Sequence, residues 1–337
     1  MTRKTLLLGA ALFALSSPAL ADHMGPSGFG GGGGVTVFGP DTMDAGHWAA
    51  ALRLAYTRPE QRSDDELEAL AERDIAAHNT DYNLNGSLGV AYGLNHHLTV
   101  SAELPYVRRG HLREADDGEV ERLGTIRGIG DLNLLAKYRL TDCENSNFAL
   151  IGGLKVPTGS THQTSSSGDR LETEHQPGTG SWDPILGASA STKLGALQLA
   201  ASALYQLSTN GAQHTRLGNR LQGGIALSHR FGESDHEHLE GRNHHHGDEL
   251  HEHHEPPHSS WDAFVEVAGE WEGRQKIDGE AEEASGGKWA WVAPGVRFNA
   301  ASGWSASAGV AIPLWQQIRP SHPDNRYRLV VSLGRAF

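Results

Sequence analysis

The chain has 337 residues, a formal charge of -13 at pH 7 and a single cysteine, Cys143. The acidic balance disfavours a nucleic-acid partner, because phosphate binding needs a basic surface. One thiol excludes both an internal disulfide and a cysteine-based metal site.

The amino-terminal segment has the pattern of a secretory signal peptide. Arg3 and Lys4 precede an apolar stretch at residues 5–15, which is too short to cross a bilayer as a helix. Residues 19–21, Ala-Leu-Ala, match a small-residue cleavage site, so we expect residues 1–21 to be removed. Beyond them no apolar run approaches the ~20 residues that a membrane helix needs. The mature chain is therefore periplasmic, secreted or a β-barrel.

Residues 22–46 form a glycine-rich leader with five consecutive glycines at 30–34. Such a segment has little apolar surface with which to order itself, so we interpret it as a flexible periplasmic leader. A plug folded into a barrel is the alternative.

From residue 48 to the carboxy terminus the sequence repeats a two-residue alternation. One parity is apolar and the other is polar or small, which is typical of strands with two unlike faces. The expected strands cover residues 48–57, 82–92, 98–106, 131–140, 148–157, 182–193, 197–206, 220–231, 261–271, 288–299, 304–314 and 325–337. Ile151 departs from the pattern, as do Trp289 and Trp291 in the weakest strand.

The polar parity carries too many ionised groups to form a dry core. We predict that it faces a wet lumen, with the lumen-facing candidates Arg53, Glu103, Asp131, Lys137, Arg139, Lys155, Asp183, Arg220, Asp262, Glu266 and Glu270. The apolar parity has Trp or Tyr near its ends, as in the aromatic girdles of membrane barrels. The prediction is an all-β fold: one transmembrane, antiparallel, up-and-down β-barrel of about 12 strands over residues 47–337. Its place is the outer membrane of a Gram-negative bacterium.

Most connections alternate between short turns and long polar loops. Because short turns are periplasmic and long loops extracellular in such barrels, an even strand number places both termini in the periplasm. The connection at residues 64–76 is expected to hold a short surface helix.

A histidine-rich loop at residues 232–260 stands where a short periplasmic turn belongs. The metal-ligand candidates are His236, His238, His244, His245, His246, His251, His253, His254 and His258. Neutral imidazole binds zinc, copper, nickel and cobalt, and the carboxylates of the loop would balance their charge. We expect a low-specificity collector of labile divalent metal ions, with no cofactor required and with binding that weakens at low pH. The alternatives are a solvated loop without ligands and a proton sensor.

Several short stretches resemble a known family. They are Gly-Ile-Gly-Asp at 128–131 with Lys-Tyr-Arg-Leu at 137–140, Lys-Val-Pro-Thr-Gly at 155–159, and Pro-Gly-Thr-Gly at 177–180. Together with the barrel pattern they resemble the outer-membrane channel family labelled for the meta-cleavage pathway of phenol degradation. The resemblance implies an outer-membrane channel and transport, and it supplies no catalytic or binding residues. The histidine-rich insertion makes phenol a less expected solute.

The sequence therefore predicts a channel or transporter for small solutes, not an enzyme, surrounded by outer-membrane lipid. Divalent metal handling through the histidine-rich loop and a periplasmic partner are further expectations. One alternative is an outer-membrane lipid hydrolase, which needs a nucleophilic serine and a histidine on the lipid face near the outer rim. His229 has the lipid parity but is expected near the periplasmic end. A non-conducting structural barrel is the other alternative.

Overall fold

The computed structural model describes residues 33–73, 75, 77–116, 119–231, 259–318 and 320–337. The predicted signal peptide, the first part of the leader and the nine histidines of the predicted metal loop lie outside these residues. No helix in the described ranges is long and apolar enough to cross a membrane.

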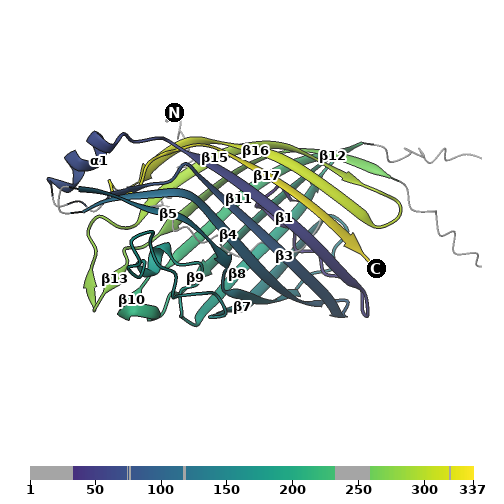
Figure 1. Cartoon of the computed structure of the whole chain (residues 1–337). Coiled ribbons are helices and arrows are strands. Elements are labelled where there is room, and N and C mark those ends of the chain that lie inside the picture. The colour runs from purple at the N-terminus through teal and green to yellow at the C-terminus, as the bar shows by residue number, and fades with distance from the viewer. Residues whose placement is uncertain (1–32, 74, 76, 117–118, 232–258, 319) are drawn as a thin grey trace, which may run out of the picture.

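In the described part of the chain, twelve antiparallel strands close into a barrel (Figure 1). They are β1 (Trp48–Pro59), β3 (Tyr82–Asn95), β4 (Leu98–Asp116), β6 (Leu132–Arg139), β7 (Ser146–Val156), β8 (Asp183–Leu194), β9 (Leu197–Gln206), β11 (Arg220–Phe231), β12 (Ser260–Glu272), β15 (Gly287–Asn299), β16 (Trp304–Ile318) and β17 (Asn325–Ala336). The ring closes where β1 pairs with β17. The predicted twelve-stranded, up-and-down barrel is confirmed.

The expected polar loop after the third strand is instead a β-hairpin. β4 continues beyond the expected end at residue 106 and turns back as β5 (Glu119–Ile129). β6 then follows β5 and pairs with the first part of β4, so β5 and β6 together act as one interrupted strand. The alternation rule missed this hairpin because its two strands carry charged side chains on both faces.

The remaining small elements gather at the end of the barrel opposite the carboxy terminus (Figure 1). They are α1 (Asp64–Ala71), β2 (Ala77–Asn79), η1 (Thr173–His175), η2 (Ala212–His214), β10 (Thr215–Arg216), β13 (Lys276–Ile277) and β14 (Glu280–Ala281). The helix α1, expected between residues 64 and 76, begins with a capping box: Ser63 accepts from the Glu66 amide, and the Glu66 carboxylate accepts from the Ser63 amide. Because the long connections other than the one between β11 and β12 lie at this end, it is the extracellular end of the barrel.

The outer surface of the barrel is an apolar belt bounded by aromatic rings. Leu186 and Leu88 in the belt are 66% and 57% exposed, values that would be costly in water but suit lipid. Trp48 packs against Tyr92 at one edge, with ring centroids 4.4 Å apart, and Tyr56 stacks on Tyr82 at the other, at 5.9 Å. Two aromatic girdles around an apolar band are the mark of an outer-membrane barrel.

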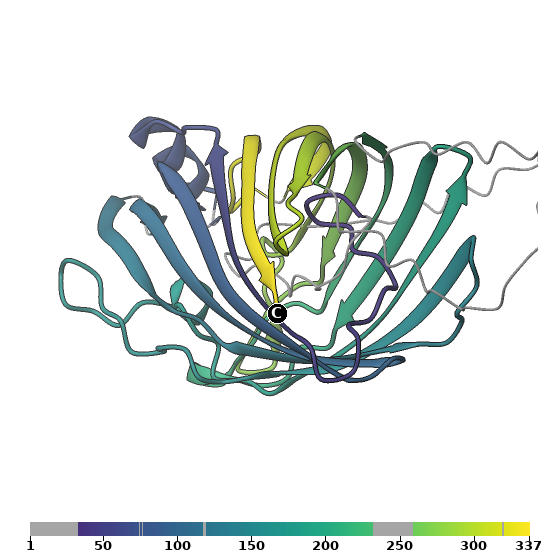
Figure 2. The ribbon, with the colours of Figure 1, turned by 90° about the vertical axis from the view of Figure 1, so that its right-hand side faces the viewer.

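Where the structure describes the leader, at residues 33–46, it lies inside the barrel, and its flexibility stays a prediction. Figure 2 looks into the barrel from the end that holds the carboxy terminus, and the purple leader runs inside the ring of strands. Val37 and Phe38 are buried there. The five glycines indicate flexibility, whereas the burial of the apolar residues directly after them opposes the entropy cost of ordering the segment. A position inside the barrel is the one that the plug alternative expects for residues 33–46.

The apolar residues that broke the strand pattern pack on this leader. Ile151 points inward and forms a cluster with Phe38, and Trp289 and Trp291 form another that packs against Val35. A register shift after Ala290 accompanies the inward Trp pair. The off-parity side chains therefore supply the apolar patches of the lumen wall on which the leader rests.

Candidate functional site

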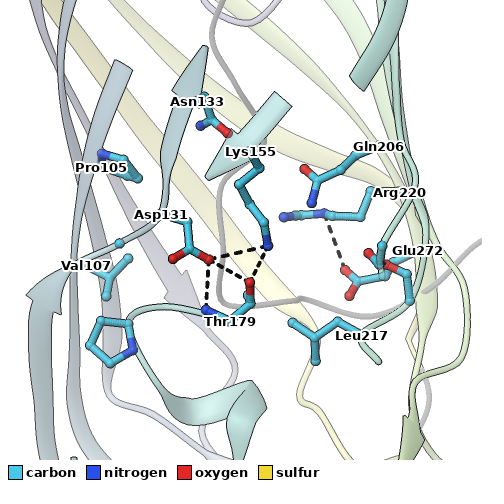
Figure 3. Close-up of a pocket in the computed structure, with 14 residues that line it drawn as sticks. Pro105, Val107, Asp131, Asn133, Lys155, Thr179, Gln206, Leu217, Arg220 and Glu272 are labelled. Atoms are coloured by element: carbon cyan, nitrogen blue, oxygen red, sulfur yellow. Dashed lines mark hydrogen bonds and ion pairs between the residues drawn. The ribbon is translucent and has the colours of Figure 1, made fainter. Parts of the chain in front are cut away.

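A buried charge cluster lies on the lumen wall near the extracellular end, where β6, β7 and β8 are neighbours. The Lys155 ammonium lies 2.6 Å from an Asp183 carboxylate oxygen and 3.4 Å from one of Asp131. Thr179, in the loop between β7 and β8, donates its hydroxyl to Asp131 at 2.6 Å and its amide at 2.8 Å. Gln206 donates to Asp183 at 3.0 Å. Figure 3 shows Lys155, Asp131 and Thr179 converging, so a loop residue completes a cluster whose other members stand on the barrel wall.

A second network lies on the neighbouring part of the wall. The Arg220 guanidinium is 3.5 Å from Glu272 and 3.7 Å from Glu270 (Figure 3 shows the first contact). Glu270 is also 3.4 Å from Arg328, whose guanidinium lies over the Trp291 ring, 4.8 Å from its centroid. The face of an aromatic ring attracts a cation. The inward Trp pair therefore contacts both the charged Arg328 of the wall and Val35 of the leader.

Glu266 on β12 holds the leader. Its carboxylate accepts the Thr36 amide at 3.0 Å, the Thr36 hydroxyl at 2.8 Å and the Val37 amide at 3.2 Å. A Cβ at Gly34 would lie 1.9 Å from a Glu266 carboxylate oxygen, so only glycine permits this approach. Glu266 is fully buried by the leader.

Three other predicted candidates also meet the leader. Arg53 donates to the Val35 carbonyl at 3.2 Å, and Lys137 donates to the Gly39 carbonyl at 3.2 Å. Glu103 lines the same space. The leader therefore spans the lumen, from β12 and β15 on one wall to β6 on the other.

Two predicted candidates lie nearer the periplasmic rim. Asp262 is 2.7 Å from Arg230 and 3.8 Å from Arg297 inside the barrel. Arg139 donates to the His96 carbonyl at 3.0 Å, so it braces a turn at the rim instead of crossing the lumen.

The lumen is narrow on the extracellular side of the leader and wide on its periplasmic side. The cavity at the Lys155 cluster has a volume of about 30 Å³, room for about two waters. The cavity on the periplasmic side has a volume of about 470 Å³ and is lined by the leader, Arg53, Glu103 and Arg297 together with apolar residues such as Trp304. In this conformation, a small organic molecule fits the inner cavity and not the outer one.

Four members of the Lys155 cluster and the Arg220 network were not among the predicted candidates: Gln206, Thr179, Glu272 and Arg328. Glu272 and Arg328 share the inward parity with those candidates, so the same rule would have found them. Thr179 lies in a loop, where alternation carries no signal, and its role depends on how residues 157–182 fold back over the mouth. The histidines predicted as metal ligands, residues 236–258, lie outside the described residues.

A family model described as "Putative MetA-pathway of phenol degradation" matches residues 28–241. No curated protein matches the sequence. Among solved structures, the chain is similar to an outer-membrane channel from Pseudomonas putida F1, with 18% identity, a TM-score of 0.56 and coverage of 88% of this chain and 97% of that one.

Two further solved structures are more distant. LpxR from Salmonella typhimurium has 12% identity and a TM-score of 0.41, with 85% of this chain and 99% of that one covered. A deletion mutant of the TodX monoaromatic hydrocarbon channel has 10% identity and a TM-score of 0.40, with 88% and 91% covered. The first likeness shows a shared barrel fold, and with the apolar belt it confirms the predicted place in the Gram-negative outer membrane.

Proposed function

Because the chain belongs to this phenol-degradation (MetA-pathway) family, we propose that it is an outer-membrane channel for small organic solutes, aromatic compounds among them. The observation that carries the proposal is the inner cavity of about 470 Å³, which lies within the about 300–1,000 Å³ typical of small-molecule sites. Its lining combines apolar side chains with the cations Arg53 and Arg297 and the anion Glu103. Such a mixture suits a solute with an apolar ring and one polar group.

The leader is the gate in this proposal. It crosses the lumen and is held by hydrogen bonds to Glu266, Arg53, Lys137 and Arg297 and by the packing of Val35, Val37 and Phe38. The outer chamber, closed by Thr179 and its loop, is a second barrier that must also open for a solute to pass.

The test is single-channel recording of purified protein in a planar bilayer. A variant with residues 35–38 replaced by Gly and Ser keeps the chain length and loses the apolar anchor, so we expect its conductance to rise several-fold above that of the unchanged protein. Asp44→Asn, at an exposed side chain of the same leader, is the control and is expected to conduct as the unchanged protein does. Heat-modifiable migration on a gel shows that each variant is folded.

The outcome that contradicts the proposal is a folded protein that never conducts, with or without its anchor. That result would favour the non-conducting structural barrel. Uptake of a small aromatic acid and of a sugar of similar mass by proteoliposomes then separates an aromatic-selective channel from a general pore.

A second proposed activity is divalent metal handling by the histidine-rich loop at residues 232–260. The nine histidines of that loop, interspersed with carboxylates, support it. Titration calorimetry with zinc, nickel and copper, on protein with and without residues 236–258, tests it. Equal binding to both forms would make the loop a solvated spacer.

The lipid hydrolase remains the competing class, and the geometry favours the channel. His229 sits at the periplasmic rim, with its Nδ1 2.8 Å from the Ala196 carbonyl and its ring edge against Phe231. A hydrolase acting on outer-leaflet lipid needs its base at the opposite rim. We expect no fatty-acid release from outer-membrane lipid by the purified protein.

A further inference from the structure

Three histidines from distant parts of the sequence meet under the extracellular cap. His78 lies on β2, His175 ends η1, and His322 lies in the connection between β16 and β17. The His78 ring centroid is 4.6 Å from that of His175 and 4.1 Å from that of His322. All three side chains are buried, with exposed fractions of 7% or less. Histidine is seldom so buried, and three together need a physical reason.

Carboxylates accompany the imidazoles. A Glu174 oxygen lies 3.7 Å from His78 Nδ1 and 3.7 Å from His175 Nε2. Glu114 faces His78 across the β2–β4 pair, and its oxygen is 3.8 Å from His175 Nε2. Glu172 is close enough to Glu114 and His175 to share one ion with them.

The backbone at each histidine is fixed by further hydrogen bonds. The Arg109 guanidinium donates to the His175 carbonyl, and Arg62 donates to the His322 carbonyl at 2.6 Å. The His78 amide donates to the Ser321 carbonyl at 2.9 Å, which ties β2 to the β16–β17 connection. These hydrogen bonds fix the backbone that carries each imidazole, so the positions of the three rings are set by the fold of the cap.

The cluster lies in the extracellular cap, outside the membrane-spanning part of the strands. Neutral imidazole is the form that coordinates a metal.

We propose that His78, His175 and Glu174 form a binding site for one divalent transition-metal ion, with zinc as the reference ion, that joins β2 to the β7–β8 loop over the mouth of the barrel, with His322 packed on the His78 ring. Two ligands of a tetrahedral zinc ion about 2.1 Å from the metal lie about 3.4 Å apart, close to the 3.7 Å seen from Glu174 to each of two histidines. A mixed set of nitrogen and oxygen ligands suits zinc, copper, nickel and cobalt better than calcium or magnesium. The site stands at the end of the barrel opposite Phe231 and Ser260, the strand ends that flank the histidine-rich loop in sequence.

In this proposal the metal ion stabilises the closed conformation of the cap. β2 and the β7–β8 loop supply the ligands, and the β16–β17 connection is attached to β2 through the Ser321 carbonyl and the His322 ring. An ion that binds the assembled centre therefore stabilises all three segments together. The cap that carries Thr179 to the outer chamber is part of the same β7–β8 loop. Metal binding outside the cell would thereby hold the outer barrier closed.

Hydrogen–deuterium exchange read by mass spectrometry tests the site on the full-length protein in detergent, with added zinc and with a chelator. The method locates the effect, so binding at the histidine-rich loop does not confuse the result. Zinc at 100 times its dissociation constant should slow the opening of residues 171–177 about 100-fold, by mass action. His78→Gln and His175→Gln should each abolish this zinc dependence, and the exposed His162→Ala on the same loop should retain it.

Cobalt absorption spectra give a second readout, because the d–d bands report the coordination number. The His78→Gln variant should lose one tetrahedral or five-coordinate cobalt per chain while its barrel migration on a gel is unchanged. Exchange of residues 171–177 that is equal with zinc and with chelator would overturn the proposal. The three histidines would then be a packed neutral cluster whose ring-edge contacts hold the cap without metal.

Discussion

The Lys155 ammonium is the one cation of the charge cluster formed with Asp131, Asp183 and Thr179. All three charged groups are buried, so its removal leaves two carboxylates without a counter-charge. We expect Lys155→Met to lower the free energy of unfolding by about 3–5 kcal/mol, the usual cost of breaking a buried ion pair from one side. Urea unfolding followed by heat-modifiable migration measures it.

Lys276→Met on the exposed β13 is the matched control and should leave the urea midpoint unchanged. A Lys155→Met variant as stable as the unchanged protein would show that water replaces the ammonium in the cluster.

A substitution at Gly34, which adds one methyl group, tests the contact between the leader and Glu266. A methyl group there would meet the carboxylate at 1.9 Å, so we expect Gly34→Ala to displace the leader and to raise the channel conductance in a planar bilayer. Gly152→Ala is the control, because a Cβ at Gly152 meets nothing within 4 Å. Unchanged conductance in both variants would mean that the leader does not limit flow.

At the scale of elements, β15 differs from its neighbours by turning two Trp side chains inward. Trp289 and Trp291 are 4% exposed, whereas Trp48 on β1, Trp261 on β12 and Trp182 directly before β8 are more than half exposed. We expect brominated lipids to quench the fluorescence of a variant that keeps only Trp182 and to leave one that keeps only Trp289 and Trp291 nearly unquenched. Equal quenching would mean that β15 is placed in the other register.

The strands could be predicted because their two faces have different solvents. Lipid outside and water or charge inside impose a strict alternation, and residues such as Leu186 and Lys155 obey it. The leader could not be predicted by that rule, since its order depends on distant strands that bring Ile151 and the Trp pair to Val35 and Phe38. The off-parity residues were visible in the sequence, and as inward apolar side chains they indicate something apolar inside the lumen.

The lumen candidates and the histidine cluster differ in the same way. The alternation within a single strand is enough to predict that Asp131 or Glu266 faces the lumen. His78, His175 and His322 lie far apart in sequence, in segments without alternation, and only the folded cap brings them together. Local spacing therefore favoured the contiguous histidines near residue 240 and gave no signal for the buried set.

At the scale of the whole molecule, the native thiol reports the orientation of the barrel. Cys143 is exposed in the short turn between β6 and β7, at the end that holds the carboxy terminus. We expect a membrane-impermeant maleimide to leave Cys143 unlabelled on intact cells and to label it after the outer membrane is permeabilised. The exposed Glu280→Cys on β14, in a chain without Cys143, should be labelled on intact cells. Labelling of Cys143 from outside would invert the assignment of the two ends, and with it the periplasmic place of the histidine-rich loop.

The leader is covalently joined to β1 through residues 44–47. The part of the lumen wall that binds the leader therefore always has the leader close by. A tether this short gives the bound segment an effective concentration in the mM range, without any contribution from protein concentration. Reclosure of the lumen is therefore a unimolecular event. A free peptide of residues 33–43 should block a barrel that lacks its anchor only at mM levels, and should compete poorly with an intact leader, as conductance traces at increasing peptide would show.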